Sequence, residues 1–177
     1  EAQVSLFSVR HDPTNNEGPL GGAIQITTTD SLGRFVFDSL ETKRYNIEAH
    51  SSDRNEGLFN FSVDLRESNQ QYLSPDTIVA KGSIIIELPE NGSVTSGYLA
   101  IPGTSFYYIL TDRDILRREF LLAGLPSGLI PDLYYRSSSS PDLVVRAIGR
   151  VEVEPNGVIE VEFEGGDSLS YHDLFAD

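Results

Sequence analysis

The sequence predicts an all-β protein. Three observations support this: many short segments rich in β-branched and aromatic residues, turn-forming residues between them, and alternation of apolar and polar side chains within them. The 177 residues are enough for one large domain or two small ones. Cysteine is absent, which excludes disulfides, thiolate metal sites and cysteine nucleophiles.

The predicted strands follow one another at short intervals. Loops rich in Gly, Pro, Asn, Asp and Ser separate them, which favours a sandwich or a barrel. We expect strands at residues 4–9, 23–29, 34–37, 45–49, 58–65, 78–88, 98–101, 106–110, 119–122, 133–136 and 143–148. Two further segments, 151–154 and 159–164, alternate apolar residues with Glu around Pro155-Asn156-Gly157 and predict a hairpin.

Residues 112–123 have a composition that favours a helix, but an internal repeat argues for a strand at 119–122 instead. Residues 29–40 and 45–53 have a counterpart, with small insertions, in residues 111–112, 118–128 and 133–138. The two copies begin at residues 29 and 111, a spacing longer than the roughly 20–50 residues of solenoid repeats. The repeat therefore indicates tandem domains. We expect a first domain at 1–80, a second at 81–164 and an acidic tail at 165–177.

The first copy of the repeat carries a recognisable motif. Thr29-Asp30-x-x-Gly33-x-Phe35-x-Phe37-x-x-Leu40, followed by Tyr45-x-Ile47-x-Ala49, resembles the carboxypeptidase-regulatory-like module, a transthyretin-like β-sandwich. The resemblance implies two tandem transthyretin-like (prealbumin-like) antiparallel β-sandwich domains. It is greatest to the modules of secreted or surface proteins of bacteria, so it implies an extracellular or cell-surface location.

The resemblance also implies an open sheet edge. Modules of this family usually begin with a strand that precedes the one expected here at Val4, Leu6 and Val9. We expect that preceding strand to be missing or supplied by another segment. An open edge invites a strand from another chain. The apolar residues of the acidic tail form a candidate docking segment, with a frayed terminus as the alternative: Leu169, Tyr171, Leu174 and Phe175.

Charge narrows the classes of partner. The formal net charge is −14, and residues 151–177 hold eight acidic side chains and no basic one. This excess repels nucleic acid and anionic membrane surfaces. We therefore expect protein partners or self-association, with polysaccharide as a further ligand class, and neither nucleic-acid binding nor membrane insertion.

The residues that carry enzyme chemistry form no recognisable pattern. The three histidines show no metal-ligand spacing, and no nucleophile elbow, phosphate-binding loop or zinc-protease motif occurs. We expect no catalysis and no cofactor. The alternative for a cofactor is calcium, a hard cation suited to the carboxylates of predicted turns: Asp30, Asp53, Asp112, Asp114 and Asp142.

Tyrosines are concentrated in the second predicted domain. Rings on the solvent face of a sheet can stack on sugars, although outward tyrosine is also an ordinary strand residue. The candidate aromatic face consists of Tyr98, Tyr107, Tyr108, Tyr134 and Tyr135. The sequence thus favours a non-catalytic structural or adhesive module of an extracellular bacterial surface assembly, with β-strand addition as a means of assembly. The alternative is a carbohydrate-binding accessory module of a secreted enzyme.

Overall fold

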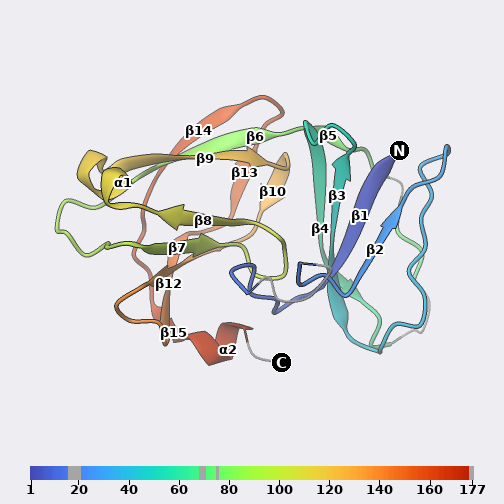
Figure 1. Cartoon of the computed structure of the whole chain (residues 1–177), viewed down its shortest axis with the longest axis horizontal. Helices are drawn as coiled ribbons and strands as arrows, with labels where there is room; N and C mark the ends of the chain where they lie inside the picture. The colour runs from blue at the N-terminus through green and yellow to red at the C-terminus, as the bar shows by residue number, and fades with distance from the viewer. Residues whose placement is uncertain (16–20, 68–70, 75, 176–177) are drawn as a thin grey trace.

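The computed structural model describes residues 1–15, 21–67, 71–74 and 76–175. Its N-terminal part is a five-stranded antiparallel sheet in the order β2-β1-β3-β4-β5, at the right of Figure 1. We call it the N-terminal sheet. Its strands are β1 (Ala2–Ser8), β2 (Gln25–Thr28), β3 (Arg44–Ser51), β4 (Glu56–Asp64) and β5 (Val79–Ala80).

The two faces of the N-terminal sheet differ in polarity, because side chains alternate between the faces along each strand. On β3, Tyr45, Ile47 and Ala49 belong to an apolar core with Val4 and Leu6 of β1. The alternate residues of β3 are polar and belong to the other face of the sheet. The all-β prediction is therefore supported here by the expected period of two.

A loop, and not a second sheet, covers the apolar face. The predicted turn at Asp30 forms, since the Gly33 N–H donates to the Asp30 carbonyl at 3.0 Å and Gly33 adopts φ +77°. Phe35 and Phe37 then pack on the core without forming the strand predicted at 34–37. Within the described residues, this part of the chain does not contain two facing sheets.

The prediction of an open edge at β1 is wrong. β1 pairs with β3 on one side and with β2 on the other, where Val4 lies opposite Thr27 and Leu6 opposite Gln25. β2 covers this edge, which agrees with the alternative that another segment supplies the strand. Val9 lies in the turn that follows β1 and not in a strand. The open edge was inferred from a family pattern, and strand order depends on long-range pairing that this pattern did not reveal.

The remaining chain forms the C-terminal sandwich, at the left of Figure 1. One sheet has the order β15-β12-β11-β7-β8, a second has the order β14-β6-β9, and β10 pairs with β13 as a two-stranded ribbon. The elements are β6 (Gly82–Glu87), β7 (Gly97–Ala100), β8 (Tyr107–Leu110), α1 (Asp112–Arg117), β9 (Glu119–Leu125), β10 (Gly128–Ile130), β11 (Leu133–Ser137), β12 (Leu143–Ile148), β13 (Val151–Val153), β14 (Val158–Glu162), β15 (Ser168–Ser170) and α2 (Tyr171–Phe175).

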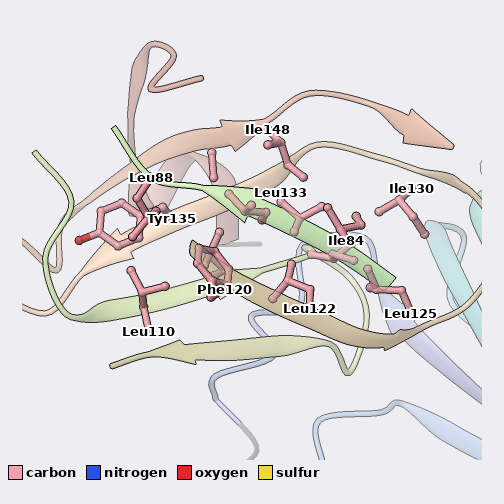
Figure 2. Close-up of a cluster of buried hydrophobic side chains, with 14 of the residues drawn as sticks. Ile84, Leu88, Leu110, Phe120, Leu122, Leu125, Ile130, Leu133, Tyr135 and Ile148 are labelled. Carbon is pink, nitrogen blue, oxygen red and sulfur yellow. The ribbon is translucent and has the colours of Figure 1, made fainter. Parts of the chain in front are cut away.

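The two larger sheets of the C-terminal sandwich enclose an apolar core. Ile84 and Leu122 come from one sheet, Leu110 and Leu133 from the other, and all four are at most 1% exposed. Figure 2 shows these side chains converging between the strands. Burial of such side chains is the main favourable contribution to folding, at about 25 cal/mol for each Å² of apolar surface removed from water.

The hairpin predicted around Pro155-Asn156-Gly157 does not form. The turn is present, with Asn156 at φ +56°. Its two arms nevertheless join different partners: β13 pairs with β10, and β14 pairs in parallel with β6, where Ile159 lies opposite Ile84. The alternation of apolar residues and Glu correctly predicted two half-buried strands, but it does not specify their partners.

The segment 112–123 divides into a short helix and a strand. Thr111 caps α1, since its side chain accepts from the Asp114 N–H and the Asp114 carboxylate accepts from the Thr111 N–H. Arg118 ends the helix in the left-handed conformation, and β9 begins at the next residue. The predicted strand at 119–122 is confirmed, whereas the helix that the repeat had argued against is present in its first half.

The tail folds back on the sandwich. β15 pairs with β12, with Leu169 opposite Val144, and α2 follows directly. Residues 176–177 of the predicted tail lie outside the described residues. In the part of the chain that is described, no helix is both long and apolar enough to cross a membrane.

Candidate functional site

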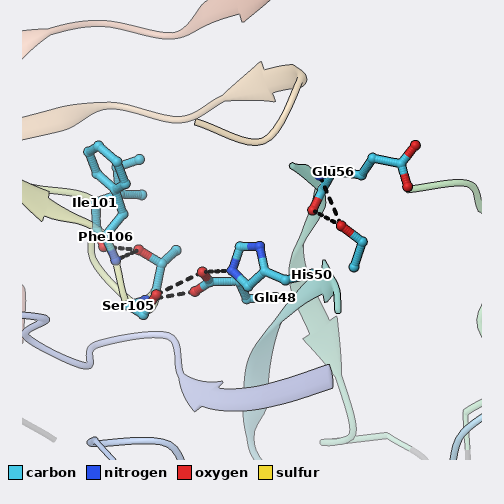
Figure 3. A network of polar contacts seen from close by, with 8 residues as sticks. Glu48, His50, Glu56, Ile101, Ser105 and Phe106 are labelled. Atoms are coloured by element: carbon cyan, nitrogen blue, oxygen red, sulfur yellow. Dashed lines mark hydrogen bonds and ion pairs between the residues drawn. The ribbon is translucent and has the colours of Figure 1, made fainter. Parts of the chain in front are cut away.

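The most highly organised polar cluster lies where the N-terminal sheet meets the C-terminal sandwich. We call it the joint, and define it as Asn46, Glu48 and His50 of β3 with residues 103–105 of the β7–β8 loop. The three β3 residues alternate with the core residues of the same strand, so they share the face turned toward the sandwich. Figure 3 shows Glu48 between His50 and Ser105.

Glu48 is the centre of the joint and is only 3% exposed. Its carboxylate accepts the Ser105 N–H at 2.8 Å and the Ser105 hydroxyl at 2.7 Å, and it lies 2.5 Å from His50 Nε2. Burial alone would raise the pKa of Glu48, but the bonds from His50 and Ser105 outweigh burial and lower this pKa below its usual value. Glu48 is therefore a buried carboxylate anion with partners from both parts of the chain.

Asn46 provides a second connection beside Glu48. Its side-chain amide donates to the Gly103 carbonyl at 3.1 Å and accepts from the Ser62 N–H at 2.9 Å. The Gly103 N–H in turn donates to the His11 carbonyl at 2.8 Å. The β7–β8 loop is thereby held by the backbone that follows β1 and by side chains of β3.

Outside the joint, the two parts also make apolar contacts and a third hydrogen-bonded connection. Phe59 and Phe61 of β4 lie with ring centroids 5.3 Å apart and pack against the core of the C-terminal sandwich. The Ser127 hydroxyl donates to the Ala80 carbonyl, next to Lys81, where the chain passes from β5 to β6. The contact between the two parts is therefore both apolar and hydrogen-bonded.

The joint has the residue types of a catalytic triad in an unsuitable arrangement. A triad places His between the nucleophile and the carboxylate, so that the imidazole can accept the hydroxyl proton. Here Glu48 lies between Ser105 and His50, and the Ser105 hydroxyl donates to the carboxylate. The geometry suits a structural bridge between β3 and the β7–β8 loop.

The predicted aromatic face divides between two sides of one sheet. Tyr135 is 5% exposed in the core, where its hydroxyl donates to the Thr95 carbonyl at 2.9 Å, and Tyr108 stacks on Phe120 with centroids 5.3 Å apart. These two assignments are wrong. Adjacent tyrosines must face opposite sides, and the sequence did not show which of each pair is buried.

Tyr98, Tyr107 and Tyr134 remain on the outer face of this sheet. Tyr107 and Tyr134 lie on either side of Ala100 in the register of three neighbouring strands, so their backbones are separated by about 10 Å. Tyr98 borders a shallow depression together with Arg136, Thr14 and Ser137. The sheet therefore presents aromatic rings beside hydroxyl groups, which is a suitable surface for sugars.

The predicted docking tail docks on its own chain. The Tyr171 hydroxyl donates to Asp12 at 2.5 Å, and the Arg136 guanidinium lies 4.1 Å from the centre of the Tyr171 ring. Phe175 packs on Tyr171 with centroids 5.0 Å apart. Leu174 lies in α2 and Leu169 in β15, where Leu169 remains 39% exposed.

Three of the five turn aspartates bond to nearby protein groups through their side chains. Asp30 accepts the Leu32 and Arg34 N–H groups, Asp53 bonds Ser51 and Asn55, and Asp114 completes the cap of α1. Among the described residues, no three His, Asp or Glu side chains are grouped as metal ligands would be.

The sequence analysis missed Glu48 as a site residue. The available signal was the alternation on the strand predicted at 45–49, which assigns Glu48 and His50 to the face opposite the apolar core. No known protein family, curated protein or solved structure matches this chain. The joint and the outer sheet face must therefore be interpreted from their own chemistry.

Proposed function

We propose that this protein is a non-catalytic structural or adhesive module of an extracellular surface assembly. The observation that carries the proposal is the buried Glu48 bridge, which fixes the N-terminal sheet to the C-terminal sandwich. A structural module has to keep its shape under load, and a bridge of this kind makes two parts behave as one rigid block. The relation to transthyretin-like modules and the surface location belong to the same proposal.

The physical cost of the bridge supports this interpretation. Removing a carboxylate from water is unfavourable unless hydrogen bonds and an opposite charge compensate. Glu48 has such hydrogen-bond partners in Ser105 and His50, and it keeps all of them only while the β7–β8 loop stays against β3.

The experiment compares Glu48→Ala with Glu160→Ala, a matched removal of an exposed carboxylate on β14. Loss of one partner from a buried pair costs about 3 kcal/mol. We expect Glu48→Ala to lower the free energy of unfolding by that amount and to enlarge the radius of gyration in small-angle X-ray scattering. Glu160→Ala should change neither quantity. Equal behaviour of the two variants would contradict a rigid block.

Location is tested on the cells that produce the protein. Antibodies against the folded chain should label intact cells, and external protease should remove the label. Labelling only after permeabilisation would refute the surface assignment, whatever the outcome for the joint.

A second candidate function is polysaccharide binding by the outer face that carries Tyr98, Tyr107 and Tyr134. Tyr107 and Tyr134 lie on either side of Ala100. This favours polysaccharide binding, since the separation of the two tyrosines suits rings that stack on a sugar chain. Tyr107→Ala should abolish retardation in gels containing a bound polysaccharide, whereas Tyr72→Ala, at an 86% exposed tyrosine elsewhere, should not. Unchanged migration of both variants in every polysaccharide gel that retards the parent would rule this function out.

A further inference from the structure

β4 has an edge that is largely without a strand partner. β5 covers only the start of β4, with Ala80 opposite Glu56 and Val79 opposite Gly57. Beyond Gly57, the described residues pair β4 on one side only, with β3. Exposed edges of this kind present backbone donors and acceptors that can pair with an added strand.

This edge borders a groove of about 640 Å³. The volume is in the range of roughly 300–1,000 Å³ that is usual for ligand sites. Phe59 and Phe61 of β4 line one side. On the other side Ile130 and Val153 of the β10–β13 ribbon are each only 1% exposed, because they belong to the core of the sandwich. Leu129 also lines the groove and is 53% exposed. The groove is therefore apolar along the side that faces the sandwich.

The described charged residues that line the groove are all acidic. Asp76, Glu152 and Glu154 are among its described lining residues, and none of those residues is Lys, Arg or His. The net charge of the whole chain, −14, adds to this negative potential. The chain's own acidic tail is unsuited to the groove, because residues 151–177 contain no basic side chain.

We propose that the open edge of β4 binds an extended segment of a partner protein in which apolar residues alternate with Lys or Arg. The segment pairs with the β4 backbone, so its side chains alternate between the two faces of the sheet. Its apolar side chains enter the groove, and its cationic side chains lie on the opposite face, where the negative potential of the three carboxylates attracts them. This inference rests on the assembly function proposed above and specifies the surface that receives the partner strand.

The binding experiment uses a seven-residue synthetic peptide of alternating valine and lysine, with both ends blocked. We expect saturable binding by fluorescence anisotropy and slower amide hydrogen exchange at residues 59–61. A valine–glutamate peptide should not bind, because it brings like charges to the rim. A valine–lysine peptide methylated at its backbone amides should also fail, because it cannot donate to β4. Equal binding of the methylated peptide would overturn strand pairing.

Two charge-matched variants locate the site. Glu152→Lys with Glu154→Lys should weaken peptide binding about tenfold. Glu160→Lys with Glu162→Lys on β14 changes the net charge by the same amount at exposed positions outside the groove, and should weaken binding less than about twofold. Equal weakening in both variants, or no binding by the parent protein, would overturn the proposal.

The inference can fail while the proposed function stands. If the peptide does not bind, yet the Glu48 variants and the labelling of intact cells behave as expected, the module is structural but does not receive a strand at β4. If the peptide binds and intact cells are not labelled, the groove is a binding site and the surface assignment is wrong.

Discussion

The Tyr171 hydroxyl donates a hydrogen bond to the Asp12 carboxylate at 2.5 Å, although the two residues are 159 positions apart. Asp12 follows β1 and is only 8% exposed, while Tyr171 begins α2 in the tail. Burial and the bond to Asp12 raise the pKa of Tyr171 to about 12. The contact therefore connects the end of the chain to its beginning with a hydroxyl that stays protonated at neutral pH.

Tyr171→Phe tests what this bond contributes. A hydrogen bond to a charged partner is worth about 1.5 kcal/mol, and we expect the free energy of unfolding to fall by that amount. Amide hydrogen exchange should accelerate in β15 and along the β12 edge that it covers. The control is Tyr107→Phe, since Tyr107 is exposed on the outer face of its sheet. Unchanged exchange in β15 would mean that strand pairing alone holds the tail.

Tyr135→Phe tests what the buried hydroxyl of Tyr135 contributes to stability. The Tyr135 hydroxyl donates to the Thr95 carbonyl and accepts from the Thr95 N–H at 3.0 Å, so its removal leaves both groups without this partner. We expect a loss of about 1 kcal/mol in urea unfolding. Stability equal to that of the parent would show that the bonds between the Tyr135 hydroxyl and Thr95 do not contribute to folding.

Gly103→Ala tests the packing of the joint. Gly103 adopts φ +72°, and an added Cβ would lie 2.2 Å from Asn46 Nδ2 and 2.9 Å from the Val9 carbonyl oxygen. Gly92, at φ +68°, has no atom within 4 Å of such a Cβ. Gly92→Ala should therefore cost only the backbone strain, about 1 kcal/mol, and Gly103→Ala at least about 2 kcal/mol more. Equal losses would show that the loop can move away from Asn46.

Acid should weaken the protein through His11. Burial lowers the pKa of His11 below its usual value of 6.5, although the charges of Asp12 and Glu48 act in the opposite direction. The unfolded chain then binds this proton more readily than the folded chain, so the stability due to neutral His11 is complete above pH 6.5 and decreases as the pH falls toward the folded pKa.

The measurement is urea unfolding of the parent and of His11→Gln between about pH 7.5 and pH 5. The difference between the two curves isolates His11 from the carboxylates, which titrate in both proteins. The parent should lose more stability on acidification than the variant. Parallel curves would show that His11 has the same proton affinity in the folded and unfolded chains.

Local patterns in the sequence predicted strands well and strand partners poorly. The strand predicted at 45–49 is present in β3, where Ile47 and Ala49 alternate with polar residues and lie in the core, because a period of two is a property of a single strand. The edge at Val4 and the hairpin at Asn156 were wrong, because strand order and pairing depend on residues far away in the chain. The strand predicted at 78–88 likewise divides at Lys81 into β5 and β6, which belong to different sheets.

The candidate sites were predictable to the same extent, since a local pattern shows which residues of one strand share a face but not which distant segment they contact. Alternation indicated that Glu48 and His50 share a face, but Ser105, their partner from another loop, lies 57 residues away from Glu48. The groove beside β4 needs the β10–β13 ribbon, whose two strands are also separated in sequence. Only the assembled fold brings these groups together, since no local spacing records their distance in space.

The parallel pairing of β14 with β6 sets an order of events for the newly made chain. β6 is synthesised well before β14, so Ile84 cannot pair with Ile159 until most of the intervening sandwich has been synthesised. Closing such a long loop makes folding slow, because chain entropy is lost before the contact forms. During synthesis the β6 edge is consequently exposed, and an unpaired strand edge makes the unfinished chain prone to aggregation.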